Sequence, residues 1–383
     1  MMDNKYTVPF KQIYNNHPSN ALHRNSLGAK LHIDWPLFCC MCLCFFIGLL
    51  VIYSSKLEWY LVKKQLLNFS VAAAAMLVMA QIKVRTYRSW APALYFGTLS
   101  ILFLVLLIGD ISKGGQRWLD LWIIRFQPAE IMKIAVPLMV ARSLDQHILP
   151  PTPKLLLLPT LYILVPVTLI ALQPDLGTAI LVASTGLFVL FFAGISWKFI
   201  ISLTTMGLLS TPVMWYLLHD YQRQRILTLL NPESDPLGSG YQIIQSKIAI
   251  GSGGFFGKGW LNGTQSHLEF LPERTTDFIF AVYGEEFGLI GILFLLTLYA
   301  IIILRGLYIG MRASDTFSRL LSGSLIMTFF VYLFVNIGMV NGILPVVGIP
   351  LPLVSYGGTS LVTVMISFGM LMSIHTHRTL VRK

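Results

Sequence analysis

The chain has 383 residues, of which 55% are hydrophobic and only 12% are charged, and its mean hydropathy is +0.70. A soluble globular domain is typically about 25% charged, so this composition excludes an ordinary soluble protein and indicates a membrane protein. The formal net charge is +11. Such an excess of Lys and Arg either forms a nucleic-acid patch or is sorted across a membrane, and the positions of the spans decide between the two.

About ten stretches are apolar enough, at about 20 residues each, to cross a hydrocarbon layer. They are expected near residues 36–53, 66–82, 92–108, 128–140, 155–172, 176–195, 199–218, 278–304, 320–340 and 353–374. The predicted fold class is therefore all-α, a polytopic helical bundle with one large extracytoplasmic loop at about 219–277. We expect a single membrane domain, 35–383, after a polar tail, 1–34.

Charge sorting orients the spans, because an even number of spans places both termini on one side. With the termini inside, about 16 basic and 4 acidic residues fall inside, against about 12 and 13 outside. This asymmetry favours cytoplasmic termini and leaves no concentrated nucleic-acid patch. The first 30 residues lack the apolar core of a signal peptide and are typical of a cytoplasmic tail.

The four cysteines, Cys39, Cys40, Cys42 and Cys44, all lie in the first span. Cys39 and Cys42 share a helix face, so a thiolate metal site is formally possible. Small apolar packing is the favoured interpretation, because nothing nearby would stabilise a thiolate in lipid.

The first group of polar residues lies in "SKGGQRWLDLWIIRFQPAEIMKI", residues 112–134. Lys113 and Arg117 fall in an outer loop. Glu130 and Lys133 are three residues apart and share one face of the next helix. Ionisable residues at membrane depth are candidates for function, although these two could simply pair to lower their cost of burial.

The second group, "LQPDLGT", predicts a tight outer hairpin. Asp175 is expected to cap the following helix or satisfy local amides, which would shape the site without performing the reaction.

The third group is the large loop, which opens with Arg223 and contains "YQIIQSKIAI" with Lys247. Its apolar spacing favours a short helix at the membrane surface. The following "GSGGFFGKGW" fails the P-loop pattern, because Gly259 stands where Ser or Thr should follow Lys258. It predicts a glycine-rich turn that brings backbone amides and Lys258 toward an anionic headgroup.

The fourth group is "NGILPVVGIPLPLVSYGGTS", where Pro345, Pro350 and Pro352 prevent a regular helix. Broken backbone at membrane depth is tolerated only inside protein or beside a wet cavity, so this segment should border a pocket. Asp277, in "FLPERTTDFIF", either caps the helix that begins near Phe278 or supplies a carboxylate beside a lipid-linked phosphate entering from the membrane.

Several long strings together resemble the SEDS family (shape, elongation, division, sporulation) from residue 35 to the end. They are "KGGQRWLDL", "RFQPAEIMKIAVPLMVAR", "QPDLGT", "HDYQRQR", "NPESDPLGSGYQIIQSKIAIGSGG", "FLPERTTDFIFA" and "GILPVVGIPLPLVSYGG". Their wording is closer to members that act in cell elongation than in division. Thr275 departs from a frequent histidine of the family, and Ala129 from its usual serine.

The resemblance implies a peptidoglycan glycosyltransferase of the bacterial cytoplasmic (inner) membrane that polymerises lipid II for cell elongation and rod shape. It implies that Asp277 is the essential outer-loop aspartate, acting as general base or holding Mg²⁺ or Mn²⁺. The expected residues for substrate and diphosphate binding are Lys113, Arg117, Glu130, Lys133, Arg223, Lys247 and Lys258. No nucleotide or organic cofactor is expected.

The partners implied are lipid II, the nascent glycan strand and a class B penicillin-binding transpeptidase, with no nucleic acid. Two alternatives use the same spans: a lipid II flippase, whose essential charges should alternate between the membrane faces, and a non-catalytic scaffold of the elongation machinery.

Overall fold

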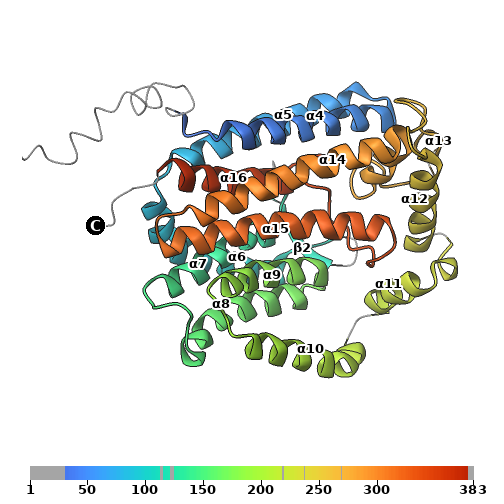
Figure 1. The fold of residues 1–383 in the computed structure, drawn as a ribbon. Helices are drawn as coiled ribbons and strands as arrows, with labels where there is room; N and C mark the ends of the chain where they lie inside the picture. The colour runs from blue at the N-terminus through green and yellow to red at the C-terminus, as the bar shows by residue number, and fades with distance from the viewer. Residues whose placement is uncertain are drawn as a thin grey trace, which may run out of the picture.

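The computed structural model describes residues 31–112, 115–120, 125–217, 220–236, 238–268 and 270–377. Within these ranges, ten long helices form the body of the protein (Figure 1): α4 (Trp35–Lys56), α5 (Trp59–Gln81), α6 (Val84–Ile108), α7 (Pro128–Asp145), α8 (Pro153–Leu172), α9 (Leu176–Phe192), α10 (Trp197–Leu217), α14 (Ile279–Met311), α15 (Thr316–Val340) and α16 (Thr359–Thr376). Each predicted span corresponds to one of them, which confirms the predicted helical membrane fold.

Length and composition make seven of the described helices able to cross a membrane, and α9 is a shorter apolar helix. The outward faces of α5, α6, α8 and α10 expose large apolar side chains. Leu67, Leu107, Leu157 and Leu209 are each more than 60% exposed. Such faces suit the hydrocarbon of a bilayer, as expected of a multi-pass membrane protein.

α7 is not among those seven apolar spans, and its position explains why. It packs against α6, α8, α9, α15 and α16, so neighbouring helices surround it. Most of its side chains are buried, including Glu130 and Lys133. Charged side chains are tolerated at membrane depth where the bundle shields them from lipid.

α6 begins at Val84, not near residue 92 as predicted, and Pro92 lies inside the helix. Because proline has no N–H, the Arg88 carbonyl loses its helical partner. The guanidinium of Arg142, on α7, donates to the Arg88 carbonyl and to that of Ser89. A neighbouring helix thus satisfies the freed carbonyl, and α6 continues through the proline.

The chain between α10 and α14 forms α11 (Asp220–Leu230), a 3₁₀ turn η1 (Pro232–Ser234), α12 (Ser239–Gly253) and the single turn α13 (Thr264–His267). α12 runs across the end of the bundle and packs against α14 (Figure 1). It is the short helix predicted within the large loop.

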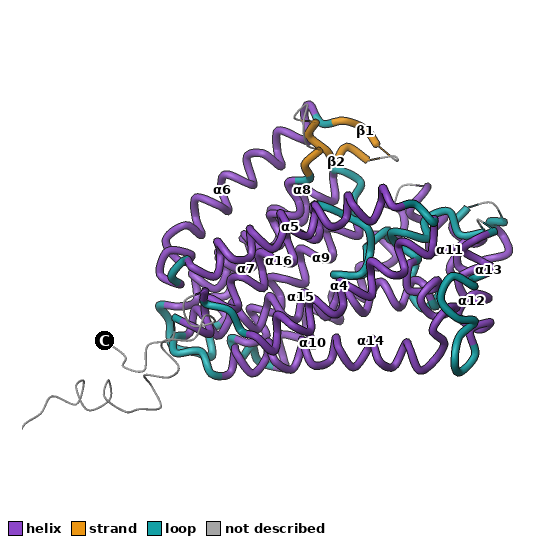
Figure 2. Tube along the Cα trace, turned by 90° about the horizontal axis from the view of Figure 1, so that it is seen from above, coloured by secondary structure: helices purple, strands orange, loops and turns teal. Residues whose placement is uncertain are grey.

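A small antiparallel sheet, which was not predicted, joins α6 to α7. Its strands β1 (Asp110–Ser112), β2 (Gly115–Asp120) and β3 (Arg125–Phe126) lie in the order β1-β2-β3, with Asp110 opposite Trp118 and Leu119 opposite Phe126. Figure 2 shows the strands together beyond the end of α6. Strands of two to six residues are too short for an alternating pattern to identify.

Both described ends of the chain lie at one end of the bundle (Figure 1). His32, before α4, stacks on His377, after α16, with ring centroids 4.1 Å apart. Asp34 caps α4 and pairs with Arg305 of α14, Nη2 to Oδ2 2.7 Å. The start of α14 therefore lies at the opposite end, beside α12.

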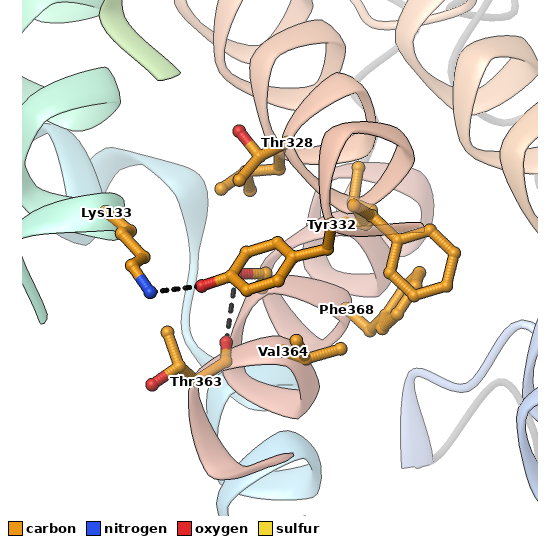
Figure 3. A pocket seen from close by; sticks show the side chains of 10 residues that line it. Lys133, Thr328, Tyr332, Thr363, Val364 and Phe368 are labelled. Atoms are coloured by element: carbon orange, nitrogen blue, oxygen red, sulfur yellow. Dashed lines mark hydrogen bonds between the residues drawn. The ribbon is translucent and has the colours of Figure 1, made fainter. Parts of the chain in front are cut away.

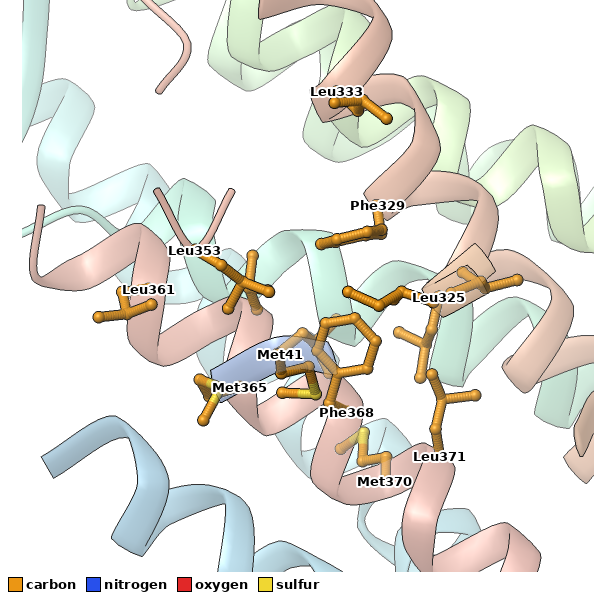
Figure 4. Close-up of a cluster of buried hydrophobic side chains, with 14 of the residues drawn as sticks. Met41, Leu325, Phe329, Leu333, Leu353, Leu361, Met365, Phe368, Met370 and Leu371 are labelled. Atoms are coloured by element: carbon orange, nitrogen blue, oxygen red, sulfur yellow. The ribbon is translucent and has the colours of Figure 1, made fainter. Parts of the chain in front are cut away.

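The core runs through the whole bundle, and one part of it lies between α4, α15 and α16 (Figure 4). Met41, Phe329, Leu353, Met365 and Phe368 meet there, and each is almost completely buried. This packing holds α15 and α16 rigidly below the irregular segment that connects them.

Candidate functional site

The segment between α15 and α16 is irregular, as its prolines predicted. It forms hydrogen bonds with the backbone of the residues just before α14. Three consecutive carbonyls accept hydrogen bonds from donors on or beside this segment. The Tyr356 amide donates to Thr275 O at 2.9 Å, and the Ser355 hydroxyl to Thr276 O at 2.5 Å. The Asn336 amide nitrogen donates to Asp277 O at 2.9 Å. The backbone that carries Asp277 is thus fixed residue by residue.

Two buried amide side chains hold the other side of the irregular segment. Asn336, on α15, also donates to Ile349 O at 2.7 Å. Gln65, on α5, donates to Ser355 O and accepts from the Gly357 amide, both at 3.2 Å. Each satisfies backbone groups that have no helical partner, which is what broken backbone inside a membrane protein requires.

Asp277 is half-buried at the end of the bundle opposite the described chain ends. It is not the helix cap, because the N-cap of α14 is Phe278, which makes no side-chain cap hydrogen bond. Its Oδ2 lies 3.4 Å from the position that a Cβ on Gly348 would occupy. The carboxylate therefore lies beside the irregular segment, and the residue at the N-cap position of α14 is Phe278 and not Asp277.

Lys133 meets Tyr332 of α15 between α7, α15 and α16 (Figure 3), and Glu130 pairs with Lys133 on α7. Lys133 Nζ lies 2.6 Å from Glu130 Oε1, donates to the Tyr332 hydroxyl, and sits 4.8 Å from the centre of the Tyr332 ring. The pair is buried, as predicted. Among the described residues, Glu130 Oε2 has no hydrogen-bond partner.

Tyr332 separates two small cavities. The first, of about 20 Å³, is lined by Lys133, Thr328, Thr363 and Ser367 among others. The second, of about 10 Å³, lies under the irregular segment beside Pro350 and Ser355. Each has room for about one water molecule and neither for a sugar.

Lys258 is held by Glu285, a fully buried residue of α14. Its Nζ lies 2.6 Å from Glu285 Oε1 and 2.7 Å from Thr264 Oγ1, and Glu285 also accepts from the amides of Thr264 and Gln265. This network pins α13 to α14. Binding of diphosphate by Lys258 stays a prediction, and in this structure its ammonium already has an anionic partner.

The glycine-rich turn around Lys258 forms hydrogen bonds with backbone groups at a break in α14. Gly288, at φ 64° and ψ −164°, interrupts the helix. The amides of Lys258 and Gly259 donate to the carbonyls of Glu285 and Glu286, both at 3.0 Å, while the amides of residues 289 and 290 donate to carbonyls of residues 254 and 255. These two turn amides are therefore bound to α14 instead of forming the predicted anion cradle.

The remaining predicted cations lie in different places. Lys247 is exposed on α12, with its Nζ 2.8 Å from where a Cβ on Gly342 would lie. Arg223 donates to the carbonyls of Trp215 and Tyr216 at the end of α10, which is a helix-capping role. Lys113 lies outside the described residues, and of Arg117 only the backbone, in β2, is described.

Asp175 is the N-cap of α9, as predicted. It accepts from the Thr178 amide at 3.2 Å and from the Thr178 hydroxyl at 2.9 Å. Arg274 was not predicted to have a role. It is buried and donates from Nε to Ser55 O at 2.8 Å, near the end of α4.

Sequence reasoning also missed Gln65, Tyr332 and Asn336. Each is a polar residue within a membrane-length helix, which is a signal for a buried contact. Their partners are distant in sequence: Gln65 and Ser355 are 290 residues apart, Tyr332 and Lys133 are 199 apart, and Asn336 and Asp277 are 59 apart. The signal therefore cannot name the contact.

Fold and site together define a multi-pass helical membrane protein with a fixed carboxylate at the end of the bundle away from the described chain ends. The family model FtsW/RodA/SpoVE, described as a cell cycle protein, matches residues 34–380. The chain belongs to this family, which confirms the resemblance to SEDS proteins.

Individual relatives agree with the family. The peptidoglycan glycosyltransferase MrdB of Escherichia coli K12 is 55% identical over 363 residues, which cover 94% of this chain and 98% of MrdB. A probable peptidoglycan glycosyltransferase FtsW of Geobacter sulfurreducens is 39% identical over 332 residues, which cover 83% and 86%.

Solved structures show the same fold. A chain from a study titled "Structural coordination of polymerization and crosslinking by a peptidoglycan synthase complex" matches with a TM-score of 0.80 at 31% identity, covering 91% of this chain and 98% of its own. Thermus thermophilus rod shape-determining protein RodA matches with a TM-score of 0.69 at 26% identity, covering 90% and 97%.

Proposed function

We propose that this protein is a peptidoglycan glycosyltransferase that polymerises lipid II into glycan strands. The names of the relatives support the reaction class. The observation that carries the proposal is the clamp on three consecutive carbonyls, Thr275 to Asp277, which fixes one carboxylate against the irregular segment. Preorganised groups of this kind are what catalysis by positioning requires.

Asp277 is the proposed general base. A sugar hydroxyl of the acceptor lipid II attacks the anomeric carbon of the growing chain, and its proton passes to the Asp277 carboxylate. The new glycosidic C–O bond forms as the C–O bond to undecaprenyl diphosphate breaks, and the diphosphate leaves with the electron pair. General base catalysis contributes about 10² to 10⁴ in rate.

Cations near the diphosphate would stabilise the charge that develops on it. Lys247 is exposed, whereas Lys133 and Lys258 each have a carboxylate partner. The proposed diphosphate contact is therefore shared between Lys247 and the Lys113–Arg117 loop, with Lys133 supplying positive charge from below. Arg223 is expected to act through the fold of the loop.

The side chains available as ligands limit how Mg²⁺ or Mn²⁺ could bind at this site. Among the described residues, no three His, Cys, Asp or Glu side chains come together. Mg²⁺ commonly takes one or two carboxylates plus phosphate oxygens and water. If Asp277 carries Mg²⁺ or Mn²⁺, the described residues offer no cluster of three such ligands, so most of the remaining ligands are expected from the substrate diphosphate and water.

Purified protein supplied with lipid II tests the proposal. We expect the natural protein to form polymer and Asp277→Asn to form none, with an unchanged melting temperature. Asp175→Asn is the matched control, because asparagine caps helices as well as aspartate does, and it should keep the activity. Equal polymer from the natural protein and Asp277→Asn would remove Asp277 from the reaction.

The same assay separates the two alternative functions. A lipid II flippase or a scaffold would form no polymer in either form. A flippase would instead move labelled lipid II across vesicles, and a scaffold would tolerate both Asp277→Asn and Lys133→Ala in cells.

The proposed location is the bacterial cytoplasmic membrane, with both termini in the cytoplasm. The shared position of the described chain ends supports one side for both. The proposed partner is a class B penicillin-binding transpeptidase, since the structural neighbour comes from a complex that polymerises and crosslinks. Copurification of the two membrane proteins tests this partner.

A further inference from the structure

One face of α15 touches both halves of the candidate site. Tyr332 and Asn336 are four residues apart, so they lie one above the other on the helix. Tyr332 contacts Lys133 of α7, and Asn336 contacts the backbone of Asp277. We propose that Tyr332 and Asn336 are positioning residues that set the separation between the Lys133 ammonium and the Asp277 carboxylate. This inference rests on the proposed function.

Tyr332 is the contact that ties Lys133 to α15. Glu130 also holds the ammonium, but it belongs to α7 itself and moves with Lys133. The Tyr332 hydroxyl accepts from Nζ, and its ring lies 4.8 Å from Nζ. Lys133 and Tyr332 are each only 4% exposed, so the ammonium is shielded from bulk water where it lies.

Asn336 is the contact that ties Asp277 to α15. Its amide nitrogen bridges Asp277 O and Ile349 O, at 2.9 and 2.7 Å, and the side chain is completely buried. Ile349 follows Gly348, the residue that the Asp277 carboxylate faces. One amide therefore sets both the carboxylate and the backbone against which it lies.

α15 is a suitable rigid element between the two contacts. Its N-terminus is capped by Asp315, which accepts from the Ser318 amide at 3.0 Å. Phe329, one turn before Tyr332, packs on Phe368 with ring centroids 5.0 Å apart. A capped helix buried on this face holds two side chains more precisely than a loop would.

The two residues should affect different kinetic constants. Lys133 is buried and acts on the bound substrate through its charge, without direct contact, so a change in its position weakens binding. Asp277 accepts a proton only in the transition state, so loosening it slows turnover. Substitution of a residue that only stabilises the fold should instead change KM and kcat together.

Tyr332→Phe removes the hydroxyl and keeps the ring. We expect KM for lipid II to rise about fivefold, the value of one hydrogen bond, with kcat nearly unchanged. Tyr95→Phe is the matched control. It removes a hydroxyl that donates to Tyr162 O at 3.0 Å between α6 and α8, and both constants should stay at the natural values.

Asn336→Leu keeps the side-chain size and removes the donor. We expect kcat to fall at least about tenfold with KM within about twofold, because small displacements of a catalytic group are costly. Asn341→Leu, at the C-cap position of α15, is the control, since the Asn341 side-chain amide bonds only to Ile337 O of the last turn. If Asn336→Leu does not fold, Asn336→Ser, which keeps one shorter donor, should show a smaller fall in kcat.

The inference is overturned if both variants match their controls, or if both constants change together in proportion to a lower melting temperature. Natural protein that forms no polymer from lipid II would instead overturn the proposed function. In that case bound lipid II still reports on Tyr332, because its Kd should rise in Tyr332→Phe and not in Tyr95→Phe.

Discussion

The Asp277 carboxylate lies against Gly348, close enough that a Cβ on Gly348 would meet Oδ2 at 3.4 Å. Gly348 has φ +81°, a backbone conformation that residues with a side chain rarely adopt. Glycine at this position therefore allows the turn and also leaves space for the Asp277 carboxylate. The contact joins two segments 71 residues apart and places the proline-rich irregular segment against the candidate base, Asp277.

Gly348→Ala should reduce both stability and polymerisation. The left-handed backbone costs an L-residue about 1–2 kcal/mol, and the new methyl group restricts the Asp277 carboxylate. Thermal unfolding and lipid II polymerisation measure the two effects. Gly97→Ala, in α6 with nothing within 4 Å of the new Cβ, should leave the activity unchanged and should not lower stability, since alanine favours a helix interior over glycine. Full activity in Gly348→Ala would contradict a required close contact.

Ser355→Ala should loosen the carbonyl clamp. The Ser355 hydroxyl donates to Thr276 O and accepts from the Leu351 amide at 2.7 Å, so the substitution leaves two buried backbone groups unpaired. The expected loss of unfolding free energy is about 2 kcal/mol or more. The activity should fall with it. Ser184→Ala, whose hydroxyl bonds only to Leu181 O in its own helix, is the control in denaturant unfolding.

Glu130→Gln should destabilise the protein strongly, because it leaves the Lys133 charge buried without an anion. Breaking one partner of a buried pair costs about 3–5 kcal/mol. The double variant with Lys133→Met removes both charges and should recover much of the stability, as melting temperatures would show. Polymerisation should not recover with it. Recovered activity in the double variant would exclude a role for the Lys133 charge.

Lys258→Ala and Lys247→Ala should separate a structural lysine from an exposed one. Lys258 neutralises Glu285, which is completely buried, so its loss should cost about 2 kcal/mol. Lys247→Ala should stay within about 0.5 kcal/mol and should weaken lipid II binding. Unfolding curves and a binding titration measure both. The assignment of Lys258 fails if its loss leaves the melting temperature unchanged.

Much of the candidate site was predictable because local rules decide it. Asp175 stands before an apolar helix and caps it, and the prolines at 345, 350 and 352 produce the expected break. The burial of Glu130 and Lys133 also followed from their setting. The boundary of α6 was wrong because Arg142, from a different helix, satisfies the carbonyl that Pro92 frees.

The contacts that build the site depend on chain segments that no local pattern connects. The cap role of Asp277 was a reasonable local reading, yet α14 begins after Phe278 and the carboxylate faces Gly348 instead. Lys258 was predicted to bind an anion, and in the structure it pairs with Glu285, which lies 27 residues later in the chain. Local sequence shows that such a group is polar and buried, but not which partner it meets.

Sequence alone determined that this protein is a helical membrane bundle, because the hydrophobic length of each span is a property of that segment by itself. Sequence also located the charged residues and the proline-rich break that are costly to expose to lipid. Tertiary structure alone decided which of them meet, since a buried charge or a broken backbone must find its partner in space, and packing of α7, α14 and α15 chose that partner.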